Sequence, residues 1–183
     1  MKLIKKSVYD SVIYFLLLFF VGSLLGFVWE VFISWFQHSD SLLETFFDTR
    51  GFLSGTWVPI YGIGLVTIVL LTRPIKEKTW LLFLYSSFIC GIVEYVTSWG
   101  LENLFHMKLW DYSSHLFNLH GRISVLSVVF FGIAGVVSVK VLEPYFRKIY
   151  SILPKYICTF ACTILSLLFL MDCTFSFLSN LFH

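Results

Sequence analysis

The chain has 183 residues, of which 58% are hydrophobic, 20% are aromatic and only 13% are charged. A soluble domain carries about 25% charged residues, so this chain has too few charges to cover a water-facing surface. Intrinsic disorder requires low hydrophobicity and is excluded by the mean hydropathy of +0.85. The net charge of +2, without a basic stripe, gives no indication of nucleic-acid binding. These values indicate a protein that crosses a lipid bilayer several times.

Apolar runs predict five transmembrane helices, because a helix needs about 20 apolar residues to cross the hydrocarbon core. The predicted spans are residues 12–36, 58–71, 80–99, 123–142 and 156–177. The second span is short and follows the glycine-rich segment 51–57, for which we expect an irregular or re-entrant path buried by protein. We therefore predict an all-α, polytopic membrane protein with one domain over residues 1–183 and partly re-entrant outer loops.

Basic residues are distributed unevenly over the ends of the predicted spans. Ten of the thirteen collect on one side: Lys2, Lys5, Lys6, Arg73, Lys76, Lys78, Lys140, Arg147, Lys148 and Lys155. The other side holds only Arg50, Lys108 and Arg122. Because Lys and Arg favour cytoplasmic loops, the N-terminus is predicted in the cytoplasm and the C-terminus outside, with the chain in the plasma membrane.

Acidic residues occur in the outer parts of three predicted spans, at Glu30, Glu94 and Asp172. An unpaired acid deep in hydrocarbon costs about 2.5–3.5 kcal/mol on insertion scales, so such a residue is expected to be paired, hydrated or protonated. Glu94, Ser98 and Glu102 are spaced four residues apart and share one helix face toward the outer loops. For Asp172 we expect an interfacial position rather than a role in a site.

A second ladder with four-residue spacing consists of Gly22, Gly26 and Glu30. Small residues along one helix face let a neighbouring transmembrane helix approach closely. We therefore predict a helix-packing seam along the first span.

The cations on the side of these acids are Arg50 and Arg122, and two interpretations are open. Glu30 with Arg50, and Glu94 with Arg122, are either buried ion pairs that fix helix register or parts of one binding site. Intramembrane ionisable residues mark functional sites by default, so the second interpretation is favoured.

No metal or cofactor site is expected. The outer loops hold His38, His106, His115 and His120, whose spacing matches no zinc motif. The four cysteines lie inside apolar runs and are interpreted as small buried hydrophobic residues. No phosphate-binding loop is present, so the chain is not expected to hydrolyse ATP by itself.

Five motifs occur in a characteristic order: TRGFLSG (49–55), PIYG (59–62), EYVTS (94–98), WDYS (110–113) and FNLHGRI (117–123). With them the chain resembles the CmpB-like family, small bacterial membrane proteins named after type IV ABC transporters, over about residues 22–135. The residues that the resemblance highlights largely coincide with the polar set of the outer half. The candidate ligand-binding residues are Glu30, Arg50, Tyr61, Glu94, Ser98, Glu102, Trp110, Asp111, Tyr112, Asn118 and Arg122.

The favoured function is transport or solute binding, by an ABC-transporter-like permease subunit with an outward-facing polar site for a small polar solute. Five spans make a thin pathway, so a homo-oligomer or a separate ATPase subunit is expected as a partner. The absence of a polar path through the last two spans counts against transport.

Two other functions remain open. The alternative is an intramembrane enzyme acting on a lipid head group or lipid-linked substrate. In that case Glu94 or Glu30 would be the general base, and Arg122 or Arg50 would hold an anionic group. A purely structural or regulatory subunit would need fewer polar residues than this sequence contains.

Overall fold

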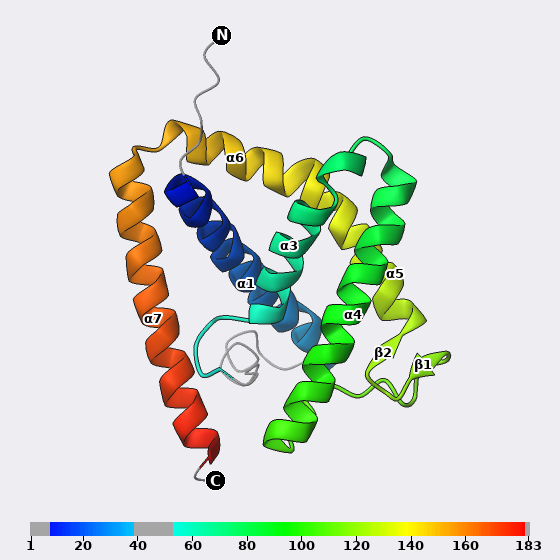
Figure 1. Ribbon diagram of the computed structural model, residues 1–183. Helices are drawn as coiled ribbons and strands as arrows, with labels where there is room; N and C mark the ends of the chain where they lie inside the picture. Colours follow the sequence, from blue (N-terminus) through cyan, green and yellow to red (C-terminus); the bar gives the residue numbers. More distant parts are fainter. Residues whose placement is uncertain (1–7, 39–52, 182–183) are drawn as a thin grey trace.

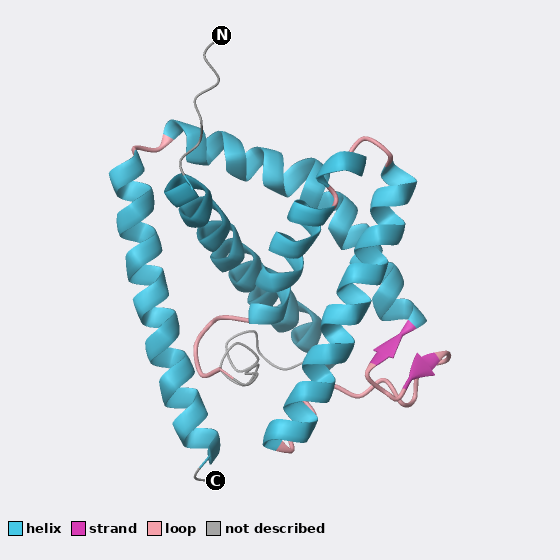
Figure 2. Cartoon of the chain, viewed as in Figure 1, coloured by secondary structure: helices cyan, strands magenta, loops and turns pink. Residues whose placement is uncertain are grey.

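The computed structural model describes residues 8–38 and 53–181, and these residues are predominantly helical (Figures 1 and 2). The helices are α1 (Val8–His38), α3 (Pro59–Leu71), α4 (Thr79–Phe105), α5 (Val125–Val137), α6 (Glu143–Ile152) and α7 (Lys155–Leu181). Shorter elements are the 3₁₀ turn η1 (Arg73–Ile75), the π-helical turn η2 (Ser138–Leu142) and the antiparallel strands β1 (Asn118–Leu119) and β2 (Ile123–Ser124). The predicted all-α fold is confirmed.

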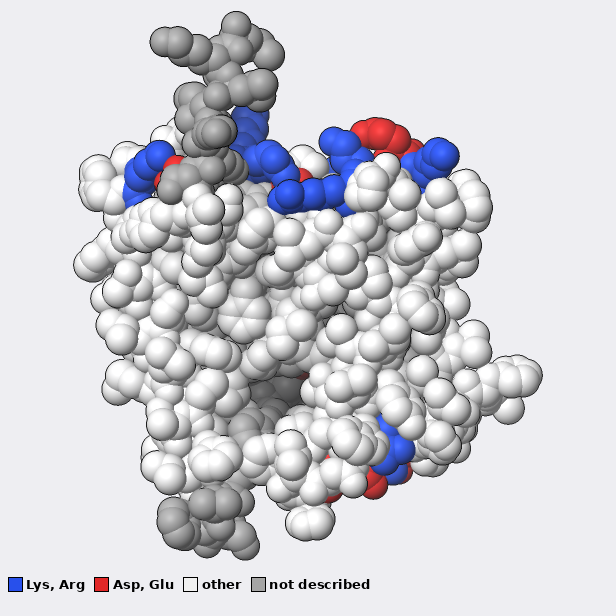
Figure 3. All heavy atoms as spheres, in the orientation of Figure 1, with Lys and Arg blue, Asp and Glu red and all other residues white. Residues whose placement is uncertain are grey.

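The described helices account for all five predicted spans. Four segments are long and apolar enough to cross a bilayer, namely Val8–Phe36, Thr79–Phe105, Val125–Ile152 and Lys155–Ser179, and α3 is a shorter apolar helix. Large apolar side chains are exposed along these helices, and the face drawn in Figure 3 is almost free of charged side chains over its broad middle. Such a surface suits contact with lipid chains.

Helix α3 packs against α1 along the glycine seam predicted from the sequence. A Cβ added at Gly22 would lie 3.0 Å from the Cα of Gly62, and one added at Gly26 would lie 2.4 Å from Cγ of Tyr61. Lipid gives little hydrophobic drive for helix association, so close van der Waals contact of this kind stabilises the pair instead. The seam brings Tyr61 beside Glu30, one turn further along α1.

Small residues also join α4 to α5. A Cβ added at Gly132 would lie 2.3 Å from the hydroxyl oxygen of Ser87, and one added at Gly135 would lie 2.2 Å from Cβ of Ser86. The main core cluster lies where α1, α3, α4 and η2 meet, and its members include Leu18, Ile68, Leu82 and Val139. Helices α1, α3, α4 and α5 thus surround the region in which Glu30 and Glu94 lie.

Helix α6 crosses one end of the bundle, close to the start of α1 (Figure 1). The predicted fourth span ends at residue 142, but the helix continues through η2 and α6 to Ile152. Glu143 is buried at this junction, where it accepts a hydrogen bond of 2.7 Å from the Tyr14 hydroxyl and binds Arg147 one turn later. These two partners compensate the buried carboxylate of Glu143, so the helix can continue beyond the predicted end of the span.

Residues 53–58 contain no helix or strand and are hydrogen-bonded to α7. Nearer its start, α7 packs on α1 through Cys158 and Cys162. The backbone N–H of Gly55 donates to Oδ2 of Asp172 at 3.0 Å. Asp172, expected to be an interfacial residue, therefore holds the irregular segment to α7. The predicted irregular path over residues 51–57 is confirmed from residue 53 onward, and its first two residues lie outside the described chain.

Most of the described basic residues gather at the α6 end of the molecule, which we call the basic end (Figure 3). Its members are Arg73, Lys76, Lys78, Lys140, Arg147, Lys148 and Lys155. The opposite end, called the loop end, carries residues 106–124 between α4 and α5, including Lys108 and Arg122.

Candidate functional site

Two carboxylates inside the helical bundle are held by hydroxyl groups. The first is Glu30 on α1, whose Oε1 accepts a hydrogen bond of 2.5 Å from the Tyr61 hydroxyl on α3. Pro59 lies in the first turn of α3, where the backbone N–H that proline lacks would have no partner within the helix. The helix can therefore begin two residues before Tyr61. Gly26 provides the space for the tyrosine ring, because any side chain there would overlap it.

The second carboxylate, Glu94 on α4, is only 4% exposed. Its Oε1 accepts a hydrogen bond of 3.0 Å from the Tyr112 hydroxyl, and its Oε2 lies 3.1 Å from the Ser127 hydroxyl on α5. Ser127 is held in place because it forms a capping box with Ser124 at the start of α5. Burial and the neighbouring Glu94 carboxylate raise the pKa of Tyr112 well above its ordinary value, so its phenol stays protonated and donates at neutral pH.

A cavity of about 70 Å³ lies between α3, α4 and α5, with Glu94 and Tyr61 in its wall. The rest of the wall is mainly apolar and includes Leu65 and Phe131, and it reaches Ser138 in the π-helical turn. The cavity therefore connects the level of the two carboxylates with the middle of the bundle.

Arg122 does not form the predicted ion pair with Glu94. Its guanidinium binds Glu102, with Nη2 2.5 Å from Oε2, and lies 5.5 Å from the centre of the Tyr95 ring. Glu102 is two turns closer to the loop end and is partly exposed, so an arginine in the loop reaches it without being drawn deep into the bundle. Tyr112 takes the place at Glu94 that the prediction assigned to Arg122.

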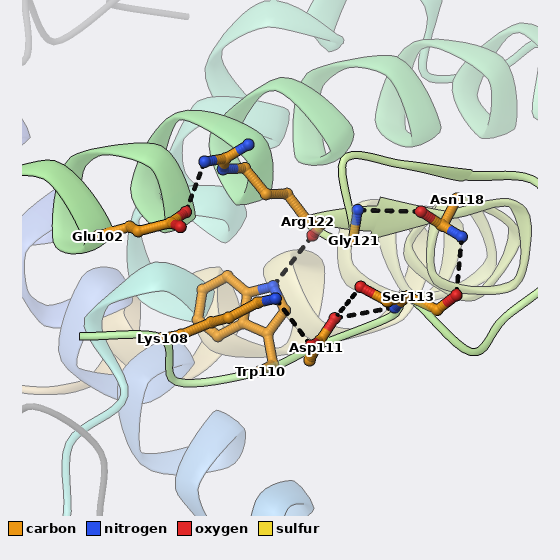
Figure 4. A network of polar contacts seen from close by, with 8 residues as sticks. All are labelled: Glu102, Lys108, Trp110, Asp111, Ser113, Asn118, Gly121 and Arg122. Atoms are coloured by element: carbon orange, nitrogen blue, oxygen red, sulfur yellow. Dashed lines mark hydrogen bonds and ion pairs between the residues drawn. The ribbon is translucent and has the colours of Figure 1, made fainter. Parts of the chain in front are cut away.

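Asp111 and Asn118 build the loop rather than the buried part of the site (Figure 4). Asp111 binds Lys108 at 2.7 Å and accepts hydrogen bonds from the N–H and hydroxyl of Ser113. The Asn118 side chain accepts from the N–H of Gly121 at 2.9 Å and donates to two loop carbonyls. Gly121 has φ +67°, and a Cβ there would meet both Ser113 and Asp111, so glycine is required at the turn.

The Lys108 ammonium and the two Ser113 hydrogen bonds hold the pKa of Asp111 well below its usual range. The carboxylate is thus charged at neutral pH and keeps the loop folded. Trp110, in the same loop, donates from Nε1 to the carbonyl oxygen of Arg122 at 3.0 Å. Together these contacts position Tyr112 over Glu94.

The structure therefore divides the predicted site residues into two groups. The inner group contains Glu30, Tyr61, Glu94 and Tyr112, and also Ser98, which is buried like Glu94 and lies on the same face of α4 one turn away. The loop group contains Glu102, Trp110, Asp111, Asn118 and Arg122 (Figure 4). Arg50, and with it the predicted pair with Glu30, lies outside the described residues.

Sequence reasoning missed Ser127, whose hydroxyl faces Glu94. A signal was available, because Ser124 and Ser127 have capping spacing immediately before an apolar run. The contact between the Tyr95 hydroxyl and Nδ1 of His120, 2.8 Å apart, was also not predicted. Within residues 8–38 and 53–181, no group of three or more His, Cys, Asp or Glu side chains could hold a metal ion.

No curated protein matches this chain, and no solved structure matches it. A family model does match, over residues 17–177, which extends past both ends of the region in which the sequence motifs lie. The predicted resemblance to CmpB-like proteins is confirmed. The chain belongs to the family described as "Putative ABC-transporter type IV".

Proposed function

We propose that the protein is a membrane-spanning transport or solute-binding subunit with its site in the outer half of the bilayer. The observation that carries the proposal is the pair of carboxylates, Glu30 and Glu94, held by hydroxyl groups, with Glu94 in the wall of a cavity. Acids retained at this depth cost free energy, so a function that uses them explains why they are kept. The family name supports transport as the function class.

We further propose that the basic end faces the cytoplasm, which puts the loop end and the site outside, in the plasma membrane. The gathering of Lys and Arg at the basic end supports this orientation (Figure 3). A separate ATPase subunit or a second copy of the chain would complete the transporter.

The enzyme alternative has weaker support. It requires an arginine beside the proposed base to hold an anionic group. Arg122 binds Glu102 instead of Glu94, and the other candidate, Arg50, lies outside the described residues. The described contacts of Glu94 are to hydroxyl groups, which suit a binding site at least as well as a general base.

The experiment is a thermal-shift screen of the chain in nanodiscs against small amino acids, sugars, nucleosides and amines, using wild type and Glu94→Gln. Glutamine is nearly isosteric and still accepts hydrogen bonds, so the variant should fold and melt close to wild type. It should lose the stabilisation that a solute gives to the wild-type protein.

Glu102→Gln is the matched control, because it makes the same change two turns away on the same helix but outside the cavity wall. It should keep the solute response, although it weakens the contact to Arg122. An unchanged solute response in a folded Glu94→Gln protein would refute the proposed site.

A further inference from the structure

The cavity between α3, α4 and α5 combines one carboxylate with an apolar wall. Glu94 and Tyr61 lie at one level, and the wall continues over Leu65, Phe131 and Ala134 toward η2. A ligand that fills this space must therefore have one polar end and an apolar body. A sugar or another ligand that is polar all over would leave hydrogen-bonding groups unsatisfied against this wall, which disfavours its binding.

The polar end carries the Glu94 carboxyl group without a described cation beside it. Among the residues that the structure describes, neither Glu94 nor Glu30 forms an ion pair with Lys or Arg. Glu102 and Glu143, by contrast, each bind an arginine. Hydroxyl groups donate hydrogen bonds to both carboxylates but bring no positive charge. An anionic ligand would meet Glu94 directly and be repelled, whereas a cation would supply the missing charge.

Aromatic rings also line the cavity. The rings of Tyr61 and Phe131 both line the cavity, with their centroids 6.3 Å apart. Aromatic faces attract ammonium groups, and the attraction grows when the cation is removed from water. The carboxylate and the rings thus favour the same kind of ligand.

We propose that this cavity binds a small organic cation, with its ammonium group at Glu94 and Tyr61 and its short apolar body along Leu65 and Ala134. The inference rests on the proposed function and specifies its ligand class. Glu94 acts as the counter-ion of the ligand, and Tyr112 and Ser127 orient the carboxylate from the side of the loop and of α5.

The test uses n-butylammonium and n-hexylammonium as probes, with n-pentanol and hexanoate as neutral and anionic controls. Binding to the full chain in nanodiscs is measured by tryptophan fluorescence and by melting temperature. Both ammonium probes should stabilise the wild-type protein in a saturable manner, and the two control compounds should not. Glu94→Gln should weaken ammonium binding at least tenfold.

A pair of glycine variants controls for partitioning of the probes into lipid. Gly64 lines the cavity, and an added Cβ would make only ordinary contact, 3.6 Å from the Cys90 sulfur. Gly91 is outside the cavity wall and has an equally easy contact, 3.6 Å from Val128. Gly64→Ala should therefore weaken binding of the hexyl probe several-fold, because its methyl group occupies cavity space, while Gly91→Ala should leave binding unchanged.

Equal binding of pentanol or hexanoate would overturn the cationic ligand class. Ammonium binding that ignores both Glu94→Gln and Gly64→Ala would show that the probes bind elsewhere, and would also overturn the inference. If the ammonium probes fail while another solute class still gives a Glu94-dependent shift in the screen above, the ligand class is wrong and the proposed function stands. If Glu94→Gln changes neither experiment, both fall.

Discussion

Two buried glutamates at opposite ends of the bundle are satisfied in different ways. Glu143 is neutralised locally, because Arg147 lies one turn away on the same helix and Tyr14 donates a hydrogen bond from α1. Glu94 receives only hydroxyl donors among its described contacts, from Tyr112 and Ser127. A carboxylate with a cation beside it is suited to hold helices together, whereas one without a cation remains able to attract a charged ligand.

Gly26→Ala tests the close approach that positions Tyr61. The new Cβ would lie 2.4 Å from the tyrosine ring, so the ring or the helix must move and Tyr61 is displaced from Glu30. Overpacking of this kind costs about 1–3 kcal/mol, and the unfolding free energy in mixed micelles should fall by that order. Gly100→Ala is the control, since its Cβ would meet nothing within 4 Å; comparable destabilisation of both variants would contradict the explanation.

Asp111→Asn tests the electrostatics of the loop. Because Lys108 and Ser113 lower the pKa of Asp111, its carboxylate stabilises the folded loop above its ordinary pKa of about 4, and this contribution is lost as pH falls through the lower folded-state value. The variant should therefore melt slightly below wild type at pH 6, with a difference that shrinks as the pH is lowered below 4. A difference that is constant from pH 6 to pH 3 would show that charge is not its origin.

At the level of elements, α6 illustrates how a helix can begin as a continuation of a span and end across its neighbours. The π-helical turn η2 joins α6 to α5. The face of α6 that packs on the core carries buried Glu143 and partly buried Phe146 and Tyr150. The Tyr150 hydroxyl donates to the carbonyl oxygen of Asp10 at 3.1 Å, which ties α6 to the first turn of α1. These contacts fix the basic end of the bundle far from the candidate site.

Tyr14→Phe tests the link between α1 and α6. It removes the hydrogen bond to buried Glu143 and leaves that oxygen to Arg147 alone, so the unfolding free energy should fall by about 1–3 kcal/mol. Tyr9→Phe is the matched control, because the Tyr9 hydroxyl is exposed and makes a long hydrogen bond of 3.4 Å to Thr159. Surface changes usually alter the unfolding free energy by no more than about 0.5 kcal/mol. Solute responses should be intact in both variants, since neither residue lines the cavity; equal stability of the two would refute the link.

For the molecule as a whole, the distribution of charge and the position of the cavity follow the same axis. Most described basic side chains lie at the basic end, whereas the loop of residues 106–124 lies at the opposite end (Figures 1 and 3). Glu94 is hydrogen-bonded to Tyr112 of that loop, and Glu30 lies in the half of α1 that is farther from the basic end. With the basic end in the cytoplasm, a solute would reach the carboxylates from outside. The orientation and the proposed direction of access are therefore tested together.

Cysteine labelling in intact cells, in a background without native cysteines, tests the orientation. Ser114→Cys in the exposed loop should react with a membrane-impermeant thiol reagent, whereas Glu77→Cys beside η1 should react only after permeabilisation. Labelling of Glu77→Cys alone would reverse the orientation and place the candidate site on the cytoplasmic side.

The helical class, the five apolar segments, the uneven distribution of basic residues and the glycine seam were all predictable from the sequence. Each depends on residues that are close together in the chain: the length of an apolar run, or a four-residue spacing on one helix face. The depth of Glu30 and Glu94 follows from the same local counting. The end of the fourth span was predicted less well, because burial of Glu143 depends on Tyr14, 129 residues away.

Only the tertiary structure decided which partner each acid receives. From the sequence, Arg122 was a candidate partner of Glu94 because it has the opposite charge and lies at a similar level along the predicted spans. In the folded loop, however, Arg122 binds Glu102, and Tyr112 binds Glu94. Ser127 completes that contact from α5, 33 residues further along the chain. Hydrogen bonds form over about 3 Å and depend on side-chain direction, which charge and span depth do not specify; it is set by how helices and loops from distant parts of the chain pack.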